Sequence, residues 1–188
     1  MTQHSKVILD LAVTLDGFIE GINGEIDWCI MDPEMDFDAF LNQIDAIIYG
    51  RKSYDLWGEY SQVLGNNEHG DDSMWEKIHS KAKYVFTRQS INDTNHAHFI
   101  NTTDLMSTVN KIKSQCEQDI WLYGGADIIT SFIEHNLIDE YRLSVHPVVL
   151  GKGKPLFENV QDRLNLTLKQ TNIYKSGVVQ LIYGKARF

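Results

Sequence analysis

Three short segments of this chain contain glycine, and each follows an apolar, strand-like run. They are Leu15–Ile19, Tyr49–Tyr54 and Tyr123–Asp127. A strand that ends in glycine and leads into a helix directs backbone N–H groups outward at the positive end of the helix dipole, where an anion binds. Two such junctions, one of them with Arg51, suit a ligand with several phosphates, such as a dinucleotide. These segments therefore predict an enzyme that uses a nicotinamide cofactor.

A second group of candidate residues lies in the acidic segment Glu25–Asp38. Asp32 and Pro33 there predict the start of a helix, because aspartate caps and proline is tolerated in the first turn. The helix would bury one apolar stripe formed by Phe37, Phe40, Leu41 and Ile44. Asp36 lies beside this stripe and Glu34 at its other edge, so either carboxylate could reach the mouth of a pocket. Either could equally be the acidic charge that a first helical turn favours.

Cysteines and histidines give weaker indications. Cys29 and Cys116 match no metal-ligand spacing and are expected to be free thiols; a catalytic Cys29 lacks a histidine nearby in the sequence. His96 and His98 could share one face of a strand, but no third ligand is evident, so we expect no metal site.

The composition is that of an ordinary globular protein of 188 residues, with 43% hydrophobic and 23% charged residues. No apolar run is long enough for a membrane span, and no targeting segment is evident at the N-terminus, so we expect a cytoplasmic protein. The net charge of −9 argues against nucleic-acid binding. Residues 141–188 nevertheless carry 8 basic and 2 acidic side chains. This basic part is either a solvated surface or a docking site for an anion or a second subunit.

Apolar, β-branched runs alternate with helical patterns through most of the chain, which predicts an α/β fold in a single domain over residues 1–188. The expected parallel strands are Lys6–Thr14, Ala46–Tyr49, Lys83–Thr87, His98–Asn101 and Ile120–Tyr123. Further helices are expected at Asp72–Lys81, from Thr103 or Asp104 to about Cys116, and from Gly125 to about Asn136, with an exposed loop at Ser61–Asp72. Three later runs predict an antiparallel edge of the same sheet: Tyr141–Leu150, Leu164–Tyr174 and Val178–Tyr183.

The order of these pieces resembles the dihydrofolate reductase superfamily, and within it the reductase domain of the bifunctional riboflavin-biosynthesis deaminase-reductases and its stand-alone relatives. The residues that carry the resemblance are Asp16–Ile19, Ile47–Tyr54, Val85–Arg88, Trp121–Ala126 and Val148–Phe157. The resemblance implies a three-layer α/β/α fold with a mixed, mostly parallel central sheet and an antiparallel C-terminal edge.

The resemblance also implies NADPH as the hydride donor. Gly50, Arg51, Lys52 and Ser53 would hold the diphosphate and the adenosine end, and Arg88, after Thr87, would pair with the ribose 2′-phosphate. Tyr123, Gly124, Gly125, Ala126 and Asp127 would bring backbone close to the diphosphate. Ala126 stands where the family has a third glycine, and Asp127 places a carboxylate beside a phosphate. Ala12, Val13 and Ile19 would flank the nicotinamide, and Asp16 with Gly17 would shape a lid loop.

Hydride transfer to a carbonyl or imine needs a proton source. The family pattern places this acid at Asp36, with Glu34 as the alternative, and Trp28, Phe37 and Phe40 would line the substrate pocket. The implied substrate is a pteridine or a ribosylaminopyrimidine, whose phosphate Lys152 or Lys154 could contact. The alternative is a binding module that keeps a nucleotide or folate site without turnover. We expect a homodimer, because the C-terminal strands would leave an exposed sheet edge in a monomer.

Overall fold

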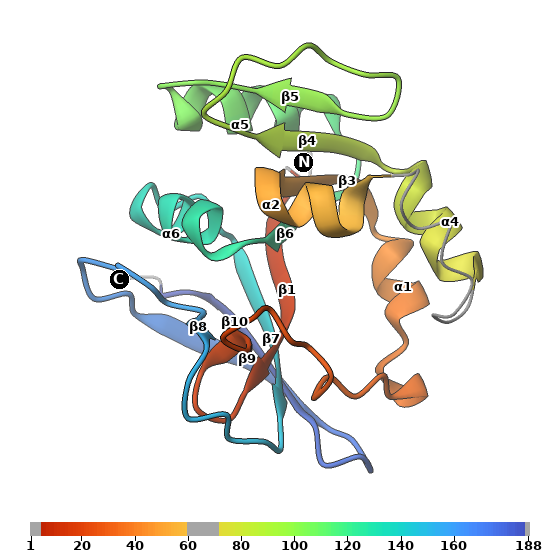
Figure 1. Cartoon of the computed structure of the whole chain (residues 1–188), viewed down its shortest axis with the longest axis vertical. Helices are drawn as coiled ribbons and strands as arrows, with labels where there is room; N and C mark the ends of the chain where they lie inside the picture. Colours follow the sequence, from red (N-terminus) through yellow and green to blue (C-terminus); the bar gives the residue numbers. More distant parts are fainter. Residues whose placement is uncertain (1–4, 60–71, 187–188) are drawn as a thin grey trace.

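A computed structural model describes residues 5–59 and 72–186, and these residues build one large sheet in the order β5-β4-β3-β6-β1-β7-β10-β9 (Figure 1). Strands β1, β3, β4, β5, β6 and β7 run parallel to one another, whereas β10 pairs antiparallel with both β7 and β9. Their bounds are β1 Val7–Thr14, β3 Ile44–Gly50, β4 Ala82–Phe86, β5 His98–Ile100, β6 Asp119–Gly124, β7 Glu140–His146, β9 Leu166–Ile173 and β10 Val179–Lys185. The predicted mixed sheet with an antiparallel C-terminal edge is confirmed.

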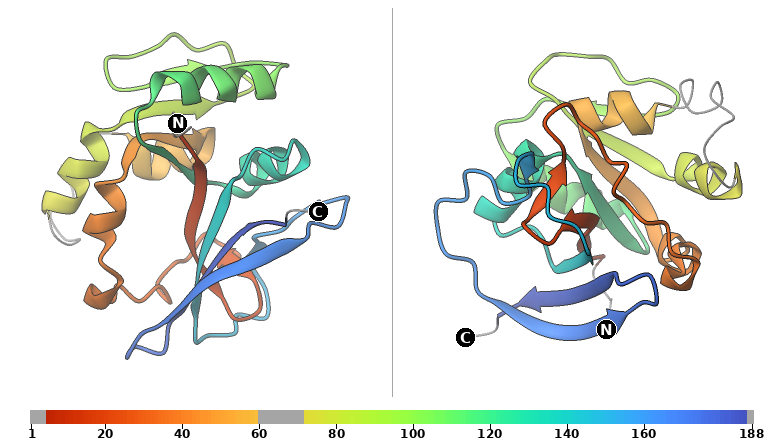
Figure 2. Two further views of the ribbon diagram at one scale, coloured as in Figure 1. Left: turned by 180° about the vertical axis from the view of Figure 1, so that it is seen from behind. Right: turned by 60° about the horizontal axis from the view of Figure 1, so that its bottom comes forward.

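The helices cover both faces of this sheet, which makes three layers (Figures 1 and 2). Helices α5 (Leu105–Gln115) and α6 (Ala126–Glu134) pack Val109, Ile112 and Phe132 against one face. Helices α1 (Phe37–Leu41) and α4 (Asp72–Ser80) pack Phe40 and Ile78 against the other. The remaining short elements are a 3₁₀ turn η1 (Pro33–Met35), α2 (Arg51–Ser53), the π-helical turn η2 (Tyr54–Gly58), and the small antiparallel pair β2 (Phe18–Glu20) and β8 (Lys154–Pro155).

Strand β1 shows how the sequence assigns side chains to these two layers. Val7 and Leu9 enter the core beneath α5 and α6, while Ile8 enters the core on the α1 side. This alternation follows from the two-residue period of a strand. Asp10 has the same parity as Ile8, and it is a carboxylate with only 8% of its surface exposed inside an otherwise apolar strand. A buried charge of this kind needs a partner.

The helix predicted after Pro33 is wrong in its length. The chain forms η1, turns at Asp36 with φ of 43°, and only then forms α1; Ile44 already begins β3. The cause is local, because the Asp36 carboxylate accepts a hydrogen bond from the Ala39 N–H and so caps a new helix instead of continuing the first turn. Aspartate tolerates this left-handed conformation better than most residues.

Strand β7 also ends earlier than the predicted Tyr141–Leu150, because Pro147 follows His146 and has no N–H for a ladder hydrogen bond. The predicted loop Ser61–Asp72 falls almost entirely outside the described residues. Strand β9 closes the sheet and pairs on one side with β10 within the described part of the chain. Covering its other edge by a homodimer stays a prediction.

Candidate active site

The two glycine junctions predicted from the sequence lie against one another at the carboxyl ends of β3 and β6. Tyr49 is in register with Gly124, so both strands finish at the same level. A methyl group added to Gly50 would lie 3.4 Å from the Gly125 nitrogen, and one added to Gly125 would lie 3.2 Å from the Ser53 hydroxyl oxygen. The fold therefore brings these glycines together with almost no room for side chains between the two backbones. We call Gly50–Ser53 and Gly124–Ala126 the glycine rim.

Helix α6 starts from this rim. Gly125 is its N-cap residue, and no side chain caps its first turn in the described structure. Gly124 has φ of 127°, a conformation that residues with side chains rarely adopt, so glycine is needed there. Ala126 is only 4% exposed, whereas Asp127 is exposed to solvent.

The cationic residues predicted near the rim differ in how free they are. The Arg51 guanidinium pairs with Asp55 at 2.8 Å and lies 5.3 Å over the Phe99 ring, so it is held on the protein surface. Lys52 is exposed. Arg88 is also exposed and follows β4, the strand next to β3, so it lies at the same edge of the sheet as Gly50. Thr87 donates its N–H to the Ile100 carbonyl.

The loop after β1 is tied to the loop after β7 by Asp16. Its carboxylate accepts hydrogen bonds from the Thr14 hydroxyl at 2.7 Å and from the N–H groups of Leu150 and Gly151 at 3.2 and 2.7 Å. These bonds, that of Thr14 above all, lower the pKa of Asp16. Gly17 completes the turn with φ of 87°. Asp16 and Gly17 therefore shape this loop, as expected, by joining two segments of the chain.

The three residues predicted to flank the nicotinamide do not share one face of the sheet. Val13 is 5% exposed within the core beneath α5 and α6, and Ile19 packs against the same core. Ala12 has the parity of Asp10 and lies on the α1 side. Lys154, one of the two lysines considered for a phosphate, pairs with Glu158, and this hydrogen bond raises the pKa of Lys154.

Aromatic rings cover the α1 face of β6. Trp121 makes edge contacts with Phe37 and Phe40, with ring centroids 5.4 and 5.5 Å apart, and Tyr123 follows at 4.9 Å from Trp121. The predicted residues Phe37 and Phe40 thus belong to one aromatic layer. Trp28 lies elsewhere, with its ring 5.4 Å from that of His146.

The structure gives Cys29 the neighbouring histidine that the local sequence lacks, since its sulfur lies 4.0 Å from His146 Nε2. The Ile30 N–H donates to Nδ1 of the same ring at 3.2 Å, which leaves the imidazole proton on Nε2, facing the sulfur. Burial raises the pKa of Cys29 and lowers the pKa of His146. Both groups are therefore neutral, and His146 is not positioned to take a proton from the thiol.

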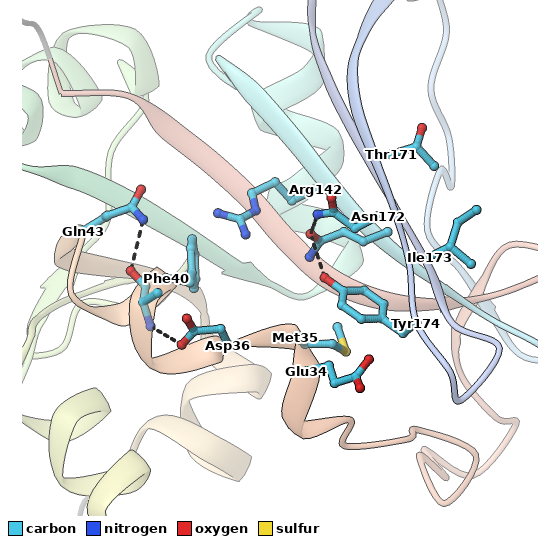
Figure 3. A pocket seen from close by; sticks show the side chains of 12 residues that line it. Glu34, Met35, Asp36, Phe40, Gln43, Arg142, Thr171, Asn172, Ile173 and Tyr174 are labelled. Carbon is cyan, nitrogen blue, oxygen red and sulfur yellow. Dashed lines mark hydrogen bonds between the residues drawn. The ribbon is translucent and has the colours of Figure 1, made fainter.

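A cavity of about 580 Å³ opens between the η1–α1 segment and strands β7, β9 and β10 (Figure 3). Three predicted residues, Glu34, Asp36 and Phe40, lie in its wall. The facing wall contributes Arg142, Asn172 and Tyr174, which were not predicted. Phe37 and Trp28 are not among the lining residues. The cavity is thus polar, with carboxylates on one side and a guanidinium on the other.

Asp10 and Arg142 form a buried pair at the back of this cavity. They are neighbours in the register of β1 with β7, and Arg142 Nε lies 3.1 Å from the Asp10 carboxylate. The guanidinium lies 4.7 Å over the Phe40 ring, and the Trp121 indole N–H donates to the Asp10 carbonyl at 2.9 Å. Burial raises the pKa of Asp10 to about 6, although Arg142 opposes this rise. In the sequence, each of these two residues is a single charged residue within an apolar, strand-like run, and this pattern could have identified them.

The described part of the chain has neither a cluster of metal-ligating side chains nor a helix suited to span a membrane. Over residues 5–59 and 72–186, no three or more His, Cys, Asp or Glu side chains are grouped so that they could hold a metal ion. His98 instead pairs with Asp93 at 2.8 Å. Nor do the helices in those ranges include one with the length and apolar character needed to cross a bilayer.

Comparisons with known proteins agree with this architecture. The uncharacterized protein YyaP of Bacillus subtilis (strain 168) is 58% identical over 183 residues, covering 96% of this chain and 95% of its own. A putative riboflavin biosynthesis protein from Shewanella sp. PV-4 has a similar structure, with a TM-score of 0.77 at 19% identity over 97% of this chain and 99% of its own. Dihydrofolate reductase from Enterococcus faecalis, solved in a complex with NADP(H), has a TM-score of 0.66 at 11% identity over 98% of this chain and 100% of its own.

The family model that matches is the RibD C-terminal domain, over residues 5–180. That range runs from the start of β1 into β10 and includes the glycine rim, the aromatic layer and most of the cavity wall. The resemblance inferred from the sequence is therefore confirmed at the level of the family and the fold. This chain belongs to the RibD C-terminal domain family, a family of reductase-type domains on the dihydrofolate reductase fold.

Proposed function

We propose that this protein is an NADPH-dependent reductase that transfers hydride to a pteridine or to a ribosylaminopyrimidine. The observation that carries the proposal is the glycine rim, where the ends of β3 and β6 lie in close backbone contact, in a fold that also holds a polar cavity with carboxylates in its wall. Open α/β sheets bind ligands at the carboxyl ends of their strands, as in this arrangement.

The residues at the rim suit a dinucleotide. The first turn of α6 begins at the rim without a side-chain cap, and its N–H groups and helix dipole favour binding of a diphosphate. Ala126 replaces the third glycine of the family pattern. Because Ala126 is buried, its methyl group does not project into the space proposed for the diphosphate. Arg88, exposed at the same edge, is the residue proposed to bind the 2′-phosphate.

The nicotinamide would supply the hydride when the cofactor is bound. Asp36 is the preferred proton donor, because one of its carboxylate oxygens caps α1 through Ala39 and the other has no hydrogen-bond partner among the described residues. That second oxygen can accept from a substrate N–H or hold a water at the cavity wall. Glu34 is less suitable, since it is paired with Lys175 at 2.5 Å. Phe40 also lies in the cavity wall, but it is only 2% exposed.

The test is a titration of the protein with NADPH and with NADH, followed by energy transfer from tryptophan to the nicotinamide. We expect NADPH to bind at least about tenfold more tightly than NADH, because a charged hydrogen bond contributes about 1.5–3 kcal/mol. Arg88→Ala is expected to remove this preference, while the exposed Arg163→Ala serves as the matched control. Absence of binding by either nucleotide would refute the proposal. Firm binding without oxidation by any pteridine or pyrimidine would favour a binding module.

A further inference from the structure

The side chain of Arg142 is restrained both by the buried acid beside it and by an aromatic ring beneath it. Its Nε lies 3.1 Å from Asp10, its guanidinium plane lies over Phe40 at 4.7 Å, and its side chain is only 16% exposed. The Nε makes an ion pair without a hydrogen bond, and the stacked ring and the burial restrict the rotation of the guanidinium before any ligand arrives. Such preorganisation lowers the entropy cost of binding.

The other end of the same guanidinium is not used by the protein. Within residues 5–59 and 72–186, the two terminal nitrogens make no hydrogen bond, and Arg142 lines the cavity. Figure 3 shows it projecting from the sheet beside Phe40, with Asp36 and Glu34 on the segment that faces it. Two parallel N–H groups in a fixed plane match the geometry of a carboxylate or phosphate.

The remaining wall of the cavity provides neutral polar groups. Gln180, which is 3% exposed, accepts from Asn172 at 3.0 Å and donates to the Ser144 hydroxyl at 3.4 Å. The two acids opposite have partners of their own, Glu34 in Lys175 and Asp36 in the α1 backbone. An anion at Arg142 would therefore have the neutral amides of Asn172 and Gln180 in the same cavity, while a hydrogen-bond donor on the same ligand could face Asp36.

We propose that Arg142 binds an oxyanion of the substrate, a carboxylate or a phosphate, through its two terminal nitrogens, and that Asp10 is the residue that positions Arg142. That the anion belongs to a substrate rests on the proposed reductase function, whereas the anion site itself rests on the geometry of the cavity. The molecule that fits both walls carries an anionic group at one end and an N–H-bearing heterocycle at the other. Lys152 and Lys154 are then not required to bind the anion.

The experiment uses benzoate and inorganic phosphate as separate probes, with the indole N–H resonance of Trp121 as the reporter, since this N–H bonds to the Asp10 backbone. We expect one probe to shift this resonance saturably, and the tighter one identifies the class of anion. Arg142→Lys keeps the charge opposite Asp10 but loses the planar fork, so binding should weaken about tenfold or more. Arg163→Lys, the same change at an exposed site outside the cavity, should leave it unchanged.

Asp10→Asn tests the positioning role, because it should weaken anion binding several-fold although Arg142 itself is not substituted. The proposal is overturned if neither probe binds, or if Arg142→Lys binds both as tightly as the natural protein while its thermal unfolding shows a folded protein. NADPH titration of Arg142→Lys separates the two proposals, since its affinity should not change. Anion binding without NADPH binding would refute only the reductase; NADPH binding without anion binding would refute only the role of Arg142.

Discussion

Replacing Asp10 with asparagine is expected to stabilise the protein at pH 8 and to have little effect near pH 4. Burial raises the pKa of this carboxyl from 3.8 to about 6 despite the nearby Arg142, and Glu140 adds to the rise. Between these two pH values the folded protein holds a proton that the unfolded chain releases, so stability falls as the pH rises. One pKa unit corresponds to about 1.36 kcal/mol, which gives a loss of about 3 kcal/mol above pH 6.

Asparagine has nearly the shape of the protonated acid and carries no charge at any pH. The Asp10→Asn variant should therefore recover about 3 kcal/mol at pH 8, or an increase in Tm of about 6 °C or more for a chain of this size. The substitution leaves the Asp10 backbone carbonyl that Trp121 binds unchanged. Thermal unfolding of both proteins from pH 4 to pH 8 measures the difference, which should grow with pH and level off above pH 6.

Asp139→Asn provides the opposite control. Burial alone would raise the pKa of Asp139, but hydrogen bonds from Lys113 and the Val7 N–H outweigh it and lower the pKa. This variant should be less stable at pH 8 and approach the natural protein in acid. If Asp10→Asn were also less stable at pH 8, the ion pair with Arg142 would stabilise the fold more than its burial destabilises it, and the reasoning would be wrong.

Three shorter predictions follow from the site. Asp36→Asn should keep the cap of α1 and the Tm, because asparagine caps a helix as well as aspartate does. The same variant should lower turnover about a hundredfold, because it removes the proton donor. Asp38→Asn is the control, and an equal loss of turnover in both variants would argue against an acid at Asp36. Gly124→Ala should lower the free energy of unfolding, measured with a chemical denaturant, by about 1–3 kcal/mol, because φ is 127° at this position. It should also weaken NADPH binding, and a variant as stable as the natural protein would contradict this prediction. Asp16→Ala should increase hydrogen exchange at the Leu150 and Gly151 amides, and unchanged protection would show that the carboxylate does not hold that loop.

If Asp10→Asn is more stable yet binds the anion less well, the buried pair is kept at a cost in stability. Proteins commonly retain strained or poorly solvated groups where a ligand needs them. Measured together, the stability and anion-binding changes of this one variant would show whether Asp10 serves the fold or the site. A variant that gains stability with no loss of anion binding would indicate that Asp10 has no role in positioning Arg142.

Local patterns in the sequence were enough to predict most of the elements and the glycine rim. The parity of β1 and the glycines after β3 and β6 reflect constraints that act within a few residues, so they are visible without knowing the fold. The same reasoning failed at Pro33–Ile44, where periodicity favoured one helix. There a single hydrogen bond from Ala39 to the Asp36 side chain divides the segment.

Hydrophobic period and turn chemistry are local, so the α/β class and the glycine junctions at the strand ends could be predicted from the sequence, and the resemblance carried by its motifs added the family. The pairing of charged groups could be seen only in the folded structure. Asp10 pairs with Arg142 through the register of β1 and β7, Cys29 reaches His146 across 117 residues, and Lys175 neutralises Glu34. Such pairings depend on the order of strands in the sheet, which no local pattern specifies, and they set which acid stays available in the cavity.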